Sequence, residues 1–105
     1  MPDKSFKDYV LDQLGFTGET ACRAMFGGHG LYRGGRFFGI IHRGRLYFKV
    51  DEASLPKYRA QGMECFRPNE RQQLTSFYEV PADVLENQSA LGEWAARAIS
   101  AAATS

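Results

Sequence analysis

Two short glycine turns constrain the fold of this chain more than any other feature. A Gly34-Gly35 pair and an Arg43-Gly44 pair each lie between short runs of aromatic and β-branched residues. Glycine in such pairs is typical of two-residue β-hairpin turns, because these turns need left-handed backbone. Aromatic and β-branched residues favour strands. The sequence therefore predicts consecutive antiparallel strands joined by tight turns.

The rest of the chain alternates between helical and strand patterns. Apolar residues recur at helical spacing near the N-terminus and again in an alanine-rich C-terminal segment. Asp51 is a candidate cap of a middle helix that Gly62 ends. No repeat or linker divides residues 1–105, so we expect one domain. The predicted helices are 4–14, 51–62, a short turn within 81–87 and 89–103, and the predicted strands are 23–26, 29–33, 36–42, 45–50, 65–68 and 73–80.

Two-residue turns also fix which residues face each other. They predict that Ile40 lies opposite Tyr47 and His42 opposite Arg45. Strict alternation then divides the strands into two faces. The core face is predicted to carry Tyr32, Phe37, Ile41, Leu46, Phe48 and Val50. The second face is predicted to carry Arg33, Arg36, Phe38, Ile40, His42, Arg45, Tyr47 and Lys49.

The middle of the chain is a basic block, although the net charge is only +1. No acidic residue occurs between Glu19 and Asp51. Aromatic and basic side chains on one sheet face are typical of platforms for single-stranded nucleic acid. The candidates for nucleic-acid or anion binding are Arg33, Arg36, Phe38, His42, Arg45, Tyr47 and Lys49.

A second interpretation of that face is that something covers it. An uncovered face containing Phe38, Ile40 and Tyr47 would leave a large apolar patch in water. Helices or a second subunit could bury the rings and leave the basic groups at the rim. The residues favour this interpretation without excluding an open binding platform.

The glycine-rich run at residues 23–36 fits no phosphate-binding template. Its spacing lacks the Lys and hydroxyl residue of a P-loop and the third glycine of a dinucleotide fingerprint. Gly27, Gly28 and Gly30 instead predict a sharp turn or bulge between two strands. The alternative is a small-ligand or enzymatic site here, using Cys22 and His29. It requires a pocket and a lowered pKa of the Cys22 thiol.

We expect no catalytic residue, metal or cofactor. The cysteines and histidines lack metal-ligand spacing, and Cys22 and Cys65 are expected to be buried thiols. The N-terminus lacks the apolar core of a signal peptide, and no apolar run is long enough to span a membrane. The sequence therefore favours a cytoplasmic protein that does not enter a membrane.

Three motifs carry a resemblance to a known family. They are R-x-M-F-G-G-x-G-L-Y at 23–32, G-R-L-Y-F-K-V-D at 44–51 and Y-E-V-P at 78–81. Over residues 5–102 the chain resembles the N-terminal domain of the TfoX/Sxy family. The resemblance implies an α+β fold of two layers, in which helices pack on one face of an antiparallel β-sheet. This architecture is similar to that of secretion chaperones, which often dimerise.

The resemblance also implies a class of function. The family is named for bacterial regulators of natural competence, which act on transcription and carry a second, C-terminal domain. This sequence contains no such second half, so we expect a stand-alone domain. The family offers no catalytic residues to transfer. We therefore expect a non-enzymatic regulatory module whose partner is another protein or a second copy, with direct nucleic-acid binding and a ligand site at the glycine turn as alternatives.

Overall fold

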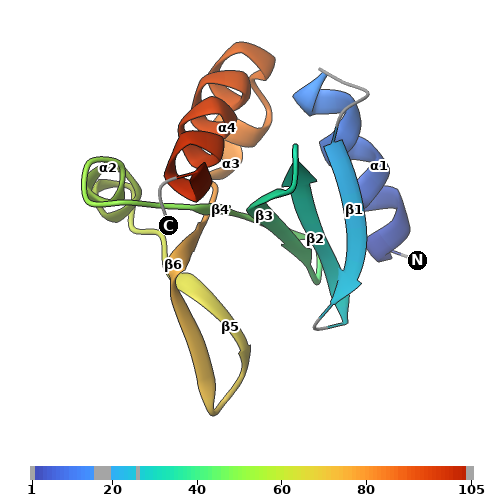
Figure 1. Cartoon of the computed structure of the whole chain (residues 1–105), viewed down its shortest axis with the longest axis horizontal. Helices are drawn as coiled ribbons and strands as arrows, with labels where there is room; N and C mark the ends of the chain where they lie inside the picture. Colours follow the sequence, from blue (N-terminus) through green and yellow to red (C-terminus); the bar gives the residue numbers. More distant parts are fainter. Residues whose placement is uncertain (1, 16–19, 26, 104–105) are drawn as a thin grey trace.

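In a computed structural model, the strands of the chain form one six-stranded antiparallel sheet in the order β1-β2-β3-β4-β6-β5 (Figure 1). The structure describes residues 2–15, 20–25 and 27–103. The predicted α+β class is confirmed. The helices are α1 (Pro2–Leu14), α2 (Leu55–Ala60), α3 (Ala82–Leu85) and α4 (Gln88–Ala103), and the strands are β1 (Thr20–Met25), β2 (Gly28–Arg33), β3 (Arg36–His42), β4 (Arg45–Lys49), β5 (Cys65–Asn69) and β6 (Gln72–Glu79).

The main core lies between the sheet and the helices. Helix α4 packs on β3 and β4, and α1 packs beside α4. The buried face of α4 includes Ala95, Ala98 and Ala101, whose small side chains let the helix lie close to the strands. The strands and Val50, which directly follows β4, contribute larger side chains to this core, and those of the strands are Leu31, Phe38, Ile41, Leu46 and Phe48. In the described part of the chain, no helix is long and apolar enough to cross a membrane.

Helix α2 begins later than the sequence pattern predicts. The Asp51 Oδ1 atom accepts hydrogen bonds from the backbone N–H groups of Ala53 and Ser54. These bonds hold a turn that precedes the helix, and α2 itself starts at Leu55 with Pro56 in its first turn. The helix ends before Gly62, whose φ is +77°. Asp51 therefore caps a turn rather than the helix.

The register that the two turns predict is confirmed. His42 lies opposite Arg45 and Ile40 opposite Tyr47. Arg33 lies opposite Arg36. The turn residues have left-handed backbone, with φ of +59° at Gly34, +80° at Gly35, +50° at Arg43 and +74° at Gly44.

Strict alternation fails at one position, and this changes the two faces of the sheet. Leu31 pairs with Gly39, but the next pair is Tyr32 with Phe37, so Phe38 has no partner on β2. This extra residue is a β-bulge, which reverses the faces of the residues beyond it. Phe38 is therefore in the main core instead of on the second face, and its ring lies 6.0 Å from that of Phe48.

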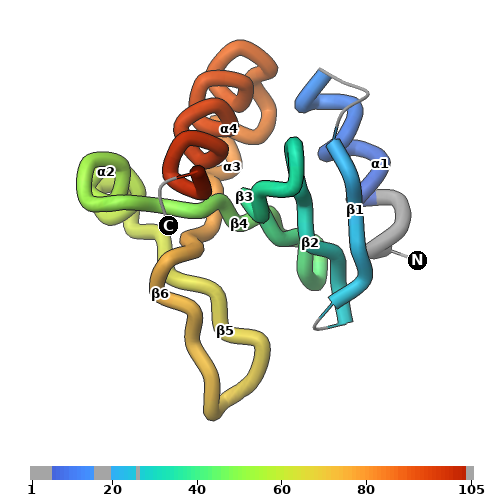
Figure 2. The backbone as a smooth tube through the Cα atoms, viewed as in Figure 1, coloured from blue at the N-terminus to red at the C-terminus, as the bar shows by residue number. Residues whose placement is uncertain are grey.

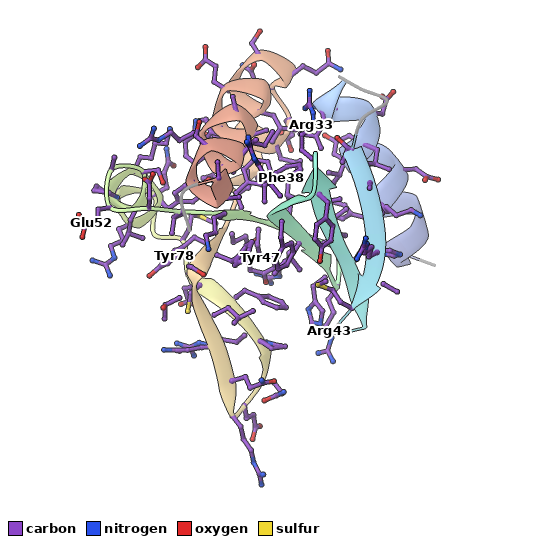
Figure 3. The ribbon with its side chains drawn as sticks, in the orientation of Figure 1. Arg33, Phe38, Arg43, Tyr47, Glu52 and Tyr78 are labelled. Carbon is purple, nitrogen blue, oxygen red and sulfur yellow. The ribbon has the colours of Figure 1, made fainter. Side chains whose placement is uncertain are left out.

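Gly39 lets core side chains approach the backbone closely at the bulge. A Cβ atom at Gly39 would lie 3.1 Å from Leu31 Cδ1 and 3.4 Å from Phe48 Cδ1. Leu31 and Phe48 therefore take up the space that a side chain at Gly39 would need, next to Phe38, which is fully buried. The bulge also explains why Arg33 lies at the α4 end of the sheet, beside Gly92 and Ile99 of α4 (Figure 3).

The β5–β6 hairpin covers part of the second face. Ile40, Tyr47, Phe66 and Phe77 form a second, smaller core there. The ring of Phe66 lies 4.9 Å from that of Tyr47 and 5.1 Å from that of His42. Figure 2 shows this hairpin extending away from the helices. Part of the predicted covering is therefore supplied by a strand pair of the same chain.

Candidate functional site

The second face of the sheet, on which none of the described helices packs, carries a row of three aromatic rings with a cation at each end. We call it the helix-free face. We call Arg23, Tyr32, Phe37, Phe77 and Lys49 the aromatic ladder. The Arg23 guanidinium lies 5.1 Å from the centre of the Tyr32 ring. Tyr32 stacks on Phe37 at 5.0 Å, and Phe37 lies 4.8 Å from Phe77. The Lys49 ammonium lies 5.5 Å from the Phe77 ring and completes the row.

Five different strands position these side chains. The tight turn places Tyr32 of β2 directly opposite Phe37 of β3, and the bulge turns both rings to the helix-free face. Lys49 of β4 lies opposite Phe77 of β6. Arg23 of β1 lies opposite Gly30, two residues before Tyr32 on β2. The ladder therefore depends on long-range strand pairing.

The ladder presents ring edges rather than ring faces. Tyr32 and Phe37 are half-buried, Arg23 is exposed and Phe77 is 4% exposed. One face of Tyr32 lies beneath Arg23 and the other against Phe37. The second face of Phe37 is turned to Phe77. Ring edges carry partial positive charge, so the row offers an apolar strip with positive character along its length.

A second charged contact lies nearby. The Arg45 Nη1 atom donates a hydrogen bond to Glu79 Oε1 at 3.0 Å. The carboxylate of Glu79 raises the pKa of Arg45 further above its ordinary value. Arg45 is thus held by an acidic partner, whereas Arg23 and Lys49 lie over aromatic rings.

The seven candidate residues predicted from the sequence are not brought together. Lys49 alone belongs to the aromatic ladder. Phe38 is buried in the main core, so its predicted place on the second face is wrong. His42 and Tyr47 lie beneath Phe66, and burial raises the pKa of Tyr47. The remaining three are Arg45, which pairs with Glu79, and Arg33 and Arg36, which the bulge turns to the helix side.

Sequence reasoning missed Arg23, Tyr32, Phe37 and Phe77. Tyr32 and Phe37 were predicted for the core face, which the bulge corrects. One signal in the sequence could have predicted the faces of Tyr32 and Phe37. A glycine inside a strand pattern often marks a bulge, and Gly39 directly follows the Phe37-Phe38 pair.

The glycines at the junction of β1 and β2 are explained by the structure. A Cβ atom at Gly28 would collide with the backbone oxygen of Ile41, so only glycine lets the strands approach there. Gly27 has a φ of +80°. Burial raises the pKa of the Cys22 thiol, against a smaller opposite effect of Lys7. A nucleophilic cysteine needs the opposite shift.

The described residues hold no group of three or more His, Cys, Asp or Glu side chains that could bind a metal ion. Cys22 and Cys65 are free thiols and are half-buried rather than fully buried as predicted. A depression of about 400 Å³ lies beside α4, lined by Arg33, Gly92, Ala96 and Ile99. Its walls supply one cation and otherwise glycine and apolar side chains, which do not form a catalytic set.

Comparison with known families shows which family the chain belongs to. The family model of the TfoX N-terminal domain matches residues 12–102. The chain belongs to the TfoX N-terminal domain family. No curated protein matches the sequence. Membership supports a regulatory, competence-related module in general terms.

Proposed function

We propose that this protein is a non-enzymatic regulatory module of the bacterial cytoplasm that contacts another protein chain through the aromatic ladder. Its regulatory output is transcription, in the setting of competence. The ladder is the observation that carries the proposal. Tyr32 and Phe37 are partly exposed on the helix-free face, and cations flank them. Half-exposed aromatic side chains beside arginine are typical of protein interfaces.

The geometry of the rings favours a protein over a nucleic acid. Nucleobases bind by stacking on ring faces. Both faces of Tyr32 are occupied, one by Arg23 and one by Phe37. Ring edges and cations suit apolar and acidic side chains of a protein. The proposed partner is therefore a protein chain, either a different regulator or a second copy in a homodimer.

Direct nucleic-acid binding is the second candidate function. It is favoured by one observation, namely that Arg23 and Lys49 bracket the rings. Rotation of Arg23 away from Tyr32 would open one ring face to a base. If this function is correct, the protein binds labelled single strands, and the binding weakens steeply with salt. Neutralising Arg23 and Lys49 together abolishes that binding.

Photocrosslinking in cells tests the proposal and separates the two candidates. The photoreactive residue p-benzoylphenylalanine replaces Phe37 in the ladder or, as a control, Tyr9 on α1, which is 40% exposed. The proposal predicts an adduct at position 37 that protease removes and nuclease does not, and no matching adduct at position 9. An adduct that nuclease removes would establish the second candidate instead. No adduct at position 37 would contradict both.

A further inference from the structure

The two edges of the sheet differ in their ability to accept another strand. At one edge, β5 contains Pro68, which has no backbone N–H, and its register against β6 shifts twice. Proline and register shifts are common protections of an edge. At the other edge, β1 pairs with β2 without a shift along residues 20–25. Of these two edges, only β1 offers an unbroken row of backbone groups.

The side chains of β1 leave this edge accessible. Thr20, Ala21, Cys22 and Ala24 are small, so they shield the backbone little. Arg23 is the charged residue of the strand, and its guanidinium turns inward over the Tyr32 ring of β2. An inward-turned charge on an edge strand disfavours pairing with an apolar or basic strand, so a strand that pairs here must bring acidic side chains to Arg23.

Positive charge lies on both sides of this edge. Arg23 is on the helix-free face as the outer end of the aromatic ladder. On the helix side, Lys7 of α1 lies near enough to Cys22 for its charge to act on the thiol. A second copy paired here would bring two Arg23 and two Lys7 side chains together, which costs free energy. A negatively charged strand would complement the charge on each face.

We propose that the outer edge of β1 binds an extended acidic segment of the partner protein as a seventh strand of the sheet. This inference rests on the proposed function, because it names the chemistry of the partner that the ladder contacts. Backbone hydrogen bonds to β1 supply affinity, and side chains of the added strand supply specificity. An acidic side chain opposite Arg23 extends the ladder by one strand. The same pairing by a second copy is disfavoured by charge.

Short peptides test the proposal with the full chain. The probe is a fluorescein-labelled peptide that alternates valine and glutamate, and its matched control alternates valine and lysine. Fluorescence anisotropy should show binding of the glutamate peptide and not of the lysine peptide. R23E should weaken binding about tenfold, the size expected for loss of one charge-assisted hydrogen bond. R67E on β5, an equal change of charge at the other edge, should leave binding unchanged.

Backbone methylation separates strand addition from simple charge attraction. One peptide carries N-methyl groups at every valine and another at every glutamate. Alternate backbone N–H groups of a strand point to opposite edges, so strand addition predicts that only one of the two peptides loses binding. Equal binding by both, or equal effects of R23E and R67E, would overturn the proposal. If no peptide binds while the protein adduct at position 37 persists, the β1 inference fails and the proposed function stands.

Discussion

The ring of Tyr32 stacks on the ring of Phe37 with centroids 5.0 Å apart and 19° between the planes. The two-residue turn sets this pairing, and the extra residue Phe38 on β3 turns both rings to the helix-free face. A single bulge therefore moves two rings out of the core and one ring into it. The surface that we propose for partner binding depends on this displacement.

The bulge predicts that alanine substitutions at two adjacent phenylalanines destabilise the fold by different amounts. Phe38 is fully buried, so F38A should lower the free energy of unfolding by about 3–5 kcal/mol. Phe37 is half-buried, so F37A should cost less than half as much. Urea unfolding of both variants measures the difference. Strict alternation would place Phe37 in the core, so a larger cost for F37A would contradict the bulge.

Two glycines should respond in opposite directions to alanine. At Gly28 a new Cβ meets the backbone oxygen of Ile41, so G28A should destabilise the fold by about 1–3 kcal/mol. At Gly92 in α4 a new Cβ has no neighbour within 4 Å. G92A should therefore stabilise the helix by about 0.5–1 kcal/mol. The urea midpoints report both effects, and a neutral G28A would refute a structural role for that glycine.

Asp51 should make stability depend on pH in the acid range. Hydrogen bonds from Ser54, together with the Arg97 guanidinium at 3.2 Å and a bond from Ala53, hold the pKa of Asp51 below its ordinary 3.8. A lowered folded-state pKa stabilises the fold above pH 3.8, and this contribution is lost as the pH falls through the folded pKa. The melting temperature should therefore fall less in D51N than in the wild type on acidification. An equal fall in both proteins would contradict this assignment.

The Cys22 thiol should react slowly. Because burial raises its pKa, less of it is thiolate near neutral pH than in an ordinary cysteine. In a C65S variant, iodoacetamide should modify Cys22 more slowly than it modifies a cysteine in a short peptide of the same local sequence. Urea should remove the difference. Faster modification in the folded protein would contradict this prediction and support an enzymatic site at the glycine turn.

The local parts of the fold could be predicted from the sequence. The pairing of His42 with Arg45 follows from a two-residue turn, because such a turn fixes register. The bulge at Phe38 could not be predicted by alternation, since it involves the close approach of Leu31 and Phe48 to the backbone of Gly39. The predicted start of α2 was wrong because Asp51 caps a turn that precedes the helix.

The candidate site was harder to predict than the fold. Tyr47 and His42 were correctly placed on one face, but their burial depends on Phe66, which reaches them from a hairpin distant in sequence. The ladder joins side chains from five strands, so no short motif contains it. The charge pattern of the sequence predicts one basic block, but in the structure its residues are divided between the two faces of the sheet.

Transcript measurements after complementation test the central claim most directly. The host lacking this protein receives the wild-type chain, a Y32S/F37S double variant, or Y9S as a control at an exposed position on α1. Circular dichroism and urea unfolding first establish that each variant is folded. The account predicts that the wild type and Y9S restore the same set of transcripts and that Y32S/F37S does not. Full restoration by a folded Y32S/F37S protein would contradict a regulatory role for the aromatic ladder.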